Sequence, residues 1–183
     1  MTAATATNSF LQRLIGAVSL DAAIYEEVEA DRGATAQALL VVVLSSVSAG
    51  IGARGLGGTS IVNILFITVV ALMGWAAWAL VTLQVGGRLL PEAQTSVDVG
   101  ELLRTTGFAA APGILRLFGV LPGVTIPVFA LCAVWMLAAM VVAVRQALDY
   151  TSTGRAILVC LIGWTLAIAL ALGVGLLFGP AAS

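Results

Sequence analysis

The chain has 183 residues, of which 61% are hydrophobic and 9% are charged, and its formal net charge is −1. Soluble proteins carry roughly 25% charged residues, and a soluble core of this size could not hide so much apolar surface. The mean hydropathy of +1.12 therefore indicates a membrane protein. The basic residues are few and scattered, so no basic stripe exists to bind the phosphates of nucleic acid, which we exclude as a partner.

The first 33 residues are predicted to be a cytoplasmic segment (1–33) that contains an amphipathic helix. Ser9 and Gln12 have the spacing of a capping box, in which each side chain binds a free backbone donor at a helix start. From Phe10 onward, apolar residues recur at spacings of three and four. We expect this helix to lie along the membrane surface, with its apolar face in the lipid.

Asp21 can cap a second short helix, which carries Glu26, Glu27, Glu29 and Asp31. Glu27 and Asp31 share a helix face because they are four residues apart. We take Glu26, Glu27 and Asp31 as candidate partner-binding residues, in a docking site for a basic partner or a divalent cation. An ordinary solvated helix face is the alternative, because carboxylates without a Gly turn are weak evidence for calcium.

Five apolar runs follow, and each is close to the length of about 20 residues that crosses a bilayer. They cover residues 34–51, 61–85, 102–120, 124–144 and 157–178. The loops between these runs are short. We therefore expect an all-α fold, a polytopic membrane helical bundle with five transmembrane helices, in which residues 34–183 form one membrane domain.

The distribution of arginine predicts the orientation, because Lys and Arg collect on the cytoplasmic side of a membrane. With the amino terminus cytoplasmic and the carboxyl terminus on the opposite side, the cytoplasmic side holds all nine acidic residues and most arginines. Every basic residue is Arg, which is typical of a GC-rich bacterial genome, so we expect a bacterial inner membrane protein. The cytoplasmic arginines are Arg13, Arg32, Arg88, Arg104, Arg145 and Arg155, and the others are Arg54 and Arg116.

The third run, 102–120, is interrupted by polar residues and by proline. Pro112 removes a helical hydrogen bond and Gly113 permits a bend, so the helix is expected to kink or break at this pair. Irregular backbone at membrane depth is tolerated only inside protein or beside a wet cavity, and transporters bind substrates at such breaks. Extension of the two arginines to opposite membrane interfaces is the alternative. The candidate polar membrane site in this run comprises Arg104, Thr105, Pro112 and Arg116.

Arg145 and Asp149, after the fourth run, complete the candidate polar membrane site. They are four residues apart and can form an ion pair on a helix. Tyr150 follows them, and aromatic residues are typical of the headgroup level of a membrane. We interpret this cluster as a membrane anchor, with a binding role as the alternative.

Small residues occupy every fourth position of the last run, namely Gly163, Ala167, Ala171, Gly175 and Gly179. Close backbone approach over Gly and Ala is a main source of contact energy between helices in lipid. The first four are therefore candidate partner-binding residues, toward another membrane protein or a second copy of the chain. Packing within one bundle is the alternative.

The residues that the chain lacks argue against catalysis. It has no His and no Lys, which removes the commonest general base, His metal ligands and the Ser-His and Ser-Lys nucleophiles. Cys132 and Cys160 fall within apolar runs, where a thiol acts as a small hydrophobe. We predict no enzyme, with no catalytic residue, no metal and no cofactor.

Three segments of the chain form a recognisable combination. They are Tyr25-Glu26-Glu27-Val28 with Asp31 and Gln37, the residues from Arg104 to Gly113, and those from Val144 to Tyr150 with Arg155. Together they resemble the Yip family, in its bacterial branch. The resemblance implies a five-span membrane protein with a cytosolic amino terminus, and the eukaryotic members of the family interact with Ypt/Rab GTPases. This chain has a shorter segment ahead of its first span than those members, so a Rab-binding role is not carried over.

Two functions from different classes follow. The preferred one is a non-catalytic scaffold or accessory subunit, which contacts membrane lipid and binds other membrane proteins or itself through the small-residue positions and the acidic helix. The alternative is a small transporter or channel for an anion, a lipid or an ion, which would use the broken third run.

Overall fold

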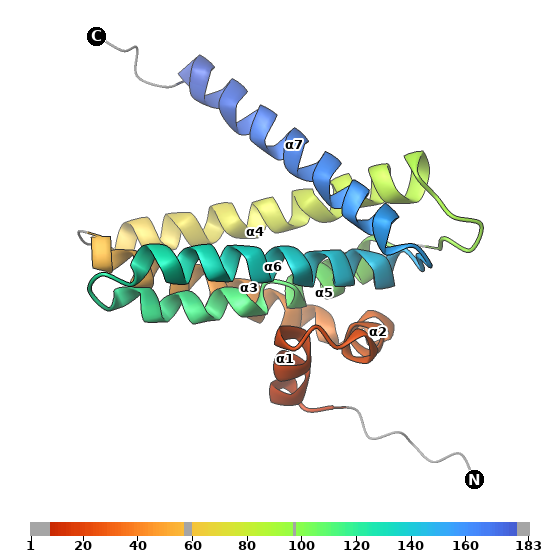
Figure 1. Ribbon diagram of the computed structural model, residues 1–183, viewed down its shortest axis with the longest axis horizontal. Coiled ribbons are helices and arrows are strands. Elements are labelled where there is room, and N and C mark those ends of the chain that lie inside the picture. The colour runs from red at the N-terminus through yellow and green to blue at the C-terminus, as the bar shows by residue number, and fades with distance from the viewer. Residues whose placement is uncertain (1–7, 57–59, 97, 179–183) are drawn as a thin grey trace.

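The computed structural model describes residues 8–56, 60–96 and 98–178, without the side chains at 55–56, 66–67, 70–71 and 167–178. All regular elements in these residues are helices (Figure 1). They are α1 (Phe10–Val18), α2 (Ala22–Ala30), α3 (Ala34–Gly52), η1 (Ala53–Leu56), α4 (Ile61–Gln84), η2 (Val85–Leu89), α5 (Val99–Phe108), η3 (Ala111–Val120), α6 (Thr125–Ala147) and α7 (Thr153–Phe178).

The two amino-terminal helices begin at the predicted caps and lie against the flank of the bundle (Figure 1). In the capping box, the Ser9 N–H donates to Gln12 Oε1 at 2.8 Å and the Gln12 N–H donates to Ser9 Oγ at 3.4 Å. Asp21 Oδ1 accepts from the Ala23 N–H at 3.0 Å, at the start of α2. Both predicted caps are confirmed, because a cap depends only on residues that are neighbours in the sequence.

The apolar residues of α1 face two different surroundings. Phe10, Leu14 and Val18 pack against the core of the bundle. Leu11 and Ile15, in contrast, are 61% and 58% exposed. One part of the apolar face therefore docks α1 on the bundle, and another part stays open on the outside.

Two of the described helices, α3 and α6, are long and apolar enough to cross a membrane. α7 adds a shorter apolar stretch, Thr153–Leu166. α4 is also long, and its Ile61 and Met73 side chains are 64% and 68% exposed. Large apolar side chains on the outside of a bundle indicate a membrane environment. The structure thus supports an all-helical membrane protein, whereas the number of five spans stays a prediction.

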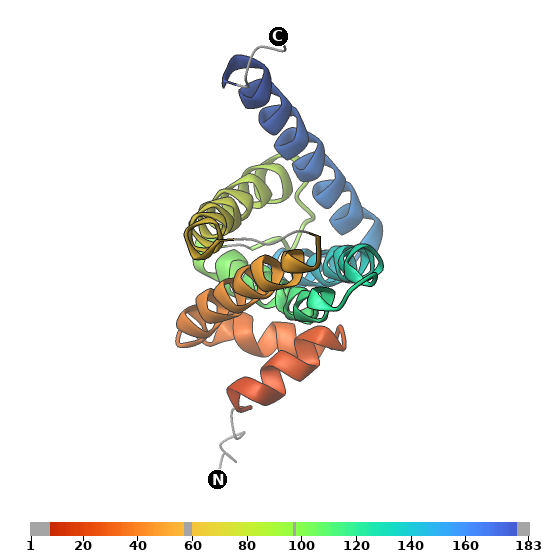
Figure 2. The ribbon, with the colours of Figure 1, turned by 90° about the vertical axis from the view of Figure 1, so that its left-hand side faces the viewer.

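The closest packing in the bundle joins α3 to α5 and η3 (Figure 2). A Cβ on Gly107 of α5 would lie only 2.7 Å from the Ala38 Cβ of α3. Similar contacts recur along α3 at intervals of seven residues, which is about two helical turns. Small residues permit this approach of the two backbones. The three contacts are Gly107 with Ala38, Gly113 with Ser45, and Gly52 with the backbone carbonyl of Arg116.

The third run is α-helical only in its first half. α5 ends at Phe108, and after two residues the chain continues as the 3₁₀-helix η3, with Pro112 at its start. The residues from Leu102 to Gly113 are buried almost throughout. This burial agrees with the expectation that irregular backbone in a membrane protein is covered by protein. A kinked transmembrane span stays a prediction.

α7 departs from the other helices, and Figures 1 and 2 both show its carboxyl-terminal end pointing away from them. Near its base, Gly163 is buried, and a Cβ there would lie 2.6 Å from the ring of Trp78 in α4. This first member of the small-residue series therefore packs inside the chain. The later members, Ala167, Ala171, Gly175 and Gly179, lie outside the residues whose surroundings are described.

Candidate functional site

An ion-pair network centred on Arg13 joins α1 to α2. The Arg13 side chain is 1% exposed, and its Nη2 lies 2.9 Å from Glu27 Oε1 and 2.8 Å from Asp31 Oδ2. Its Nη1 donates to Gln37 Oε1 of α3 at 3.1 Å. A buried guanidinium needs such partners, because a charge removed from water without them is strongly unfavourable. The network therefore fixes α1 on the bundle.

Two of the predicted partner-binding acids, Glu27 and Asp31, thus make contacts within the chain. Burial raises the pKa of the Glu27 carboxyl, but hydrogen bonds from Asn8 and Arg13 outweigh burial and hold that pKa below its ordinary value. The hydrogen bond from Arg13, with a second from the Gly33 N–H, lowers the pKa of Asp31. Both carboxylates are therefore ionised at neutral pH and held by the chain itself.

Replacing Arg13 with glutamine is expected to release α1 from the bundle. The variant loses both ion pairs, at a cost of about 1.5 kcal/mol, because the two acids are only partly buried. Hydrogen–deuterium exchange of the α1 amides should become faster while the exchange of α3 and α6 stays unchanged. Arg32→Gln is the control, since Arg32 is exposed and forms no ion pair with any described residue.

Acid should release α1 from the wild-type chain in the same way. The folded-state pKa values of Glu27 and Asp31 are lowered, so their stabilisation is complete above the ordinary carboxyl pKa of about 4 and is lost as the pH falls through the lowered values. The rate of hydrogen–deuterium exchange of the α1 amides, measured relative to an unstructured peptide at the same pH, should rise below about pH 4. Arg13→Gln should show little further rise, and an equal response of both proteins would contradict the role of the network.

Arg104 of α5 holds the end of α2. Its side chain is 5% exposed, and its Nε lies 3.0 Å from the Val28 carbonyl oxygen and 2.9 Å from that of Glu29. Its Nη2 also donates to the Glu29 carbonyl. These carbonyls lie in the last turn of α2, where backbone acceptors lack helical partners and a cation is favoured by the helix dipole. Arg104 is therefore covered by α2 and does not extend freely to a membrane interface.

A polar recess of about 630 Å³ lies beside this junction, between α2, α5 and the carboxyl end of α6. Gln146 Nε2 donates to Glu26 Oε1 at 2.8 Å across its rim. Burial, together with the charges of Asp149 and Glu101, raises the pKa of Glu29 to about 7. The recess therefore concentrates negative charge that the chain neutralises only in part. Its charged and amide lining residues are Glu26, Glu29, Glu101, Arg145, Gln146 and Asp149.

The carboxyl end of α6 separates Arg145 from Asp149. α6 ends at Ala147 and Asp149 has a positive φ of 52°, so the two side chains no longer share a helix face. Arg145 Nε donates to the Tyr150 carbonyl at 3.3 Å, and the described residues contain no Arg145–Asp149 ion pair. Tyr150 is 4% exposed, with its hydroxyl 2.8 Å from the Gly86 carbonyl oxygen. The tyrosine therefore packs inside the protein and is not exposed at the headgroup level.

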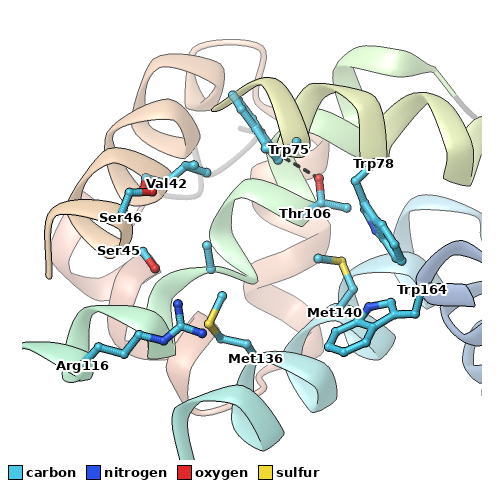
Figure 3. Close-up of a pocket in the computed structure, with 12 residues that line it drawn as sticks. Val42, Ser45, Ser46, Trp75, Trp78, Thr106, Arg116, Met136, Met140 and Trp164 are labelled. Atoms are coloured by element: carbon cyan, nitrogen blue, oxygen red, sulfur yellow. Dashed lines mark hydrogen bonds between the residues drawn. The ribbon is translucent and has the colours of Figure 1, made fainter. Parts of the chain in front are cut away.

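A second pocket, of about 370 Å³, lies between α4 on one side and η3 and α6 on the other (Figure 3). Figure 3 shows the Arg116 guanidinium pointing into it, toward Met136. The Nε of Arg116 is buried without a hydrogen-bond partner, and its Cζ lies 5.6 Å from the centre of the Phe129 ring. Arg116 thus turns inward and does not extend to a membrane interface. The aromatic and sulfur-containing lining residues are Trp75, Trp78, Trp164, Met136 and Met140.

Thr105 and Pro112, the other predicted members of the polar site, do not line this pocket. Thr105 Oγ1 donates to the Glu101 carbonyl one turn back, at 3.0 Å. Pro112 is buried near the start of η3. The structure therefore divides the candidate polar site among three places, which hold Arg104, Arg145 with Asp149, and Arg116.

A comparison with protein families matches residues 21–174 of this chain to the Yip1 domain. The chain belongs to the Yip family. The predicted family is confirmed, whereas its bacterial branch stays a prediction, and membership supports a membrane-associated role without catalysis. Comparisons with curated proteins and with solved structures found no match.

The Yip1 domain begins at the residue that caps α2, so α1 lies ahead of it. Arg13 nevertheless binds α1 to Glu27 inside the Yip1 domain. Sequence reasoning missed this pair, because the two residues are 14 positions apart on different helices and no periodicity relates them. It also missed Glu101 of the recess, although Asp98 and Glu101 have the spacing of a capping box, which the structure contains.

Proposed function

We propose that this Yip-family chain is a non-catalytic membrane scaffold or accessory subunit that binds a basic segment of another protein at its polar recess. The observation that carries the proposal is the charge of the recess, where Glu26, Glu29, Glu101 and Asp149 face Arg145. Burial and the crowding of these carboxylates raise the pKa of Glu29. A basic partner would relieve the repulsion, since complementary charge directs and stabilises association.

The surface around the recess is held rigidly by contacts between α1, α2 and the bundle. Arg104 binds the carbonyls at the end of α2. Trp135 Nε1 of α6 donates to the Val18 carbonyl at 2.8 Å, next to the turn between α1 and α2. Tyr25 is fully buried, with its hydroxyl 3.2 Å from the Ala17 carbonyl oxygen. A surface that is already ordered loses little entropy on binding, which favours a docking role.

The proposal includes five membrane spans and a cytoplasmic amino terminus in a bacterial inner membrane. In Figure 1, α2, the loop before α5 and the junction of α6 with α7 gather toward one end of the bundle, and α1 lies beside its middle. All nine acidic residues and most of the arginines belong to these segments or adjoin them. This end is the cytoplasmic one by the preference of arginine for that side, and the recess then faces soluble partners.

Native mass spectrometry of the protein, purified from its own membranes in mild detergent, tests the scaffold role. We expect the wild type to carry a defined set of other polypeptides. The double variant Glu29→Gln/Glu101→Gln should lose them, because it removes two carboxyl groups that a basic partner would pair with in the recess. A wild-type protein found only as a monomer or a homo-oligomer would contradict the proposal.

The matched control is the double variant Asp21→Asn/Asp98→Asn. It also replaces two carboxyl groups with amides, but both residues are helix caps outside the recess, and asparagine caps a helix as well as aspartate does. We expect the partners to stay bound to this variant. Equal loss from both double variants would show that net charge alone, and not the recess, determines binding.

The transporter or channel alternative has less support from the described residues. Arg104 is engaged by carbonyls of α2, and Thr105 and Thr106 donate to carbonyls of their own helix. The two threonine hydroxyls are therefore already used as donors, and Arg104 is held at the end of α2. Arg116 and Thr106 line the apolar pocket, and of these two side chains only Arg116 forms no hydrogen bond within the described residues.

A further inference from the structure

Arg116 has no counter-charge within the described part of the chain. It forms no ion pair or hydrogen bond there, and its Nε is buried without a partner. The nine acidic residues of the sequence lie in α2 and α5, in the segments next to these two helices, and just after the end of α6. These segments are toward the opposite end of the bundle from Arg116. The ring of Phe129, 5.6 Å from Cζ, supplies only a weak cation–π contact. A side-chain anion for Arg116 must therefore come from outside the chain.

The remainder of the pocket suits an apolar chain with a polar end. Three tryptophans and two methionines line it (Figure 3). The Trp75 indole N–H is already bonded to the Leu103 carbonyl, at 3.1 Å. The Trp78 Nε1, in contrast, is buried without a partner. Arg116 and Trp78 thus each bring a buried N–H without a partner to this pocket, whose other polar side chains are the hydroxyls of Ser45, Ser46 and Thr106.

The pocket also reaches the outside of the bundle. Gly74 of α4 and Trp164 of α7 both line it, and both are exposed, Trp164 by 40%. Apolar side chains are exposed on the same helices, including Met73 and Leu161. In a membrane this opening would face lipid, so a lipid molecule could enter from the side. Its volume of about 370 Å³ lies within the range of ligand pockets.

We propose that this pocket binds an anionic phospholipid, with its phosphate against Arg116. The ester carbonyls of the lipid would accept from Trp78 Nε1, and one acyl chain would leave along Trp164 between α4 and α7. Charge-assisted bonds between a guanidinium and a phosphate are strong in apolar surroundings. A free phosphate ion does not fit as well, because it would lose its hydration to a wall with few donors. This site is separate from the recess and does not depend on the scaffold role.

Lipid retention in native mass spectrometry tests the site. The delipidated protein is mixed with phosphatidylglycerol and with phosphatidylcholine of the same acyl chains, and the retained amounts are compared. We expect the wild type to prefer phosphatidylglycerol, because the phosphate of phosphatidylcholine is already neutralised by its own choline cation and gains less from a guanidinium. Arg116→Gln should lose that preference by about tenfold, the effect of one charge-assisted hydrogen bond. Arg116→Lys should keep part of the preference, because it keeps the charge.

Arg54→Gln is the matched control, because Arg54 is exposed in η1 and lies outside the pocket. It removes the same charge and should leave the preference unchanged. Trp78→Phe should weaken the retention of both lipids without changing their ratio, since both carry ester carbonyls. Circular dichroism of each variant shows whether it is folded.

Three results would overturn the proposal. One is equal retention of the two lipids by the wild type. Another is an unchanged preference in a folded Arg116→Gln variant. The third is thermal stabilisation of the wild type by inorganic phosphate as strong as that by phosphatidylglycerol, which would assign the pocket to a free anion.

Discussion

Replacing Arg104 with methionine is expected to destabilise the folded chain by about 3 kcal/mol. The guanidinium is 5% exposed and supplies charged donors to the Val28 and Glu29 carbonyls. Methionine has a similar length but no donor, so both carbonyls lose their partners, and a hydrogen bond to a charged group contributes about 1.5 to 3 kcal/mol. For a chain of this size, the melting temperature should fall by about 6 to 12 °C.

Thermal unfolding in mild detergent, followed by circular dichroism, measures this effect. Arg88→Met is the control, because Arg88 is exposed in η2 and makes no side-chain contact with an acid among the described residues. The control should change the free energy of unfolding by less than about 0.5 kcal/mol. Exchange of the α2 amides should rise only in Arg104→Met. Equal melting temperatures for the two variants would show that Arg104 is not a structural link.

Features that depend on neighbouring residues could be predicted from the sequence. The caps at Ser9 and Asp21, the helical class and the family resemblance all follow from short segments. The capping box at Asp98 carried the same signal and could have been found. Such features need no knowledge of which helices meet, because their energy is local.

Features that depend on packing could not be predicted in this way. Arg104 lies 76 residues from Val28, and only the fold brings α5 to the end of α2. The direction of the Arg116 side chain could not be predicted either. A guanidinium in an apolar run can extend to a membrane interface or turn into the bundle, and the packing of neighbouring helices determines which of the two occurs. Among the small residues of the last run, Gly163 has described surroundings, and it packs on Trp78.

The close contact between α3 and α5 had a signal that sequence reasoning did not use. Ala38, Ser45 and Gly52 recur every seven residues on one face of α3, and each meets a glycine or the backbone of the third run. Repeats of small residues at spacings of four and seven are both compatible with close helix packing. This seam between α3 and the third run was therefore encoded in the small residues of the first apolar run and in Gly107 and Gly113 of the third.

Replacing Gly107 with alanine tests this seam and is expected to destabilise the chain by about 1 to 2 kcal/mol. The new Cβ would lie 2.7 Å from the Ala38 Cβ and 3.1 Å from Trp75 Cζ2, so α3 and α5 must move apart. Overpacking of this kind costs roughly 1 to 3 kcal/mol, which outweighs the better helix propensity of alanine. The Trp75 hydrogen bond to the Leu103 carbonyl should be disturbed at the same time.

Gly74→Ala is the same substitution at a position with free space around it, and we expect it to raise the free energy of unfolding instead of lowering it. A Cβ at Gly74 would meet no described atom within 4 Å, and the residue lies inside α4. Alanine should therefore stabilise this helix by about 0.5 to 1 kcal/mol, because glycine loses more backbone entropy on folding. Thermal unfolding of both variants separates packing from propensity. A melting temperature that rises in both variants would mean that α3 and α5 can adapt to an added methyl group, so that the seam is not tightly packed.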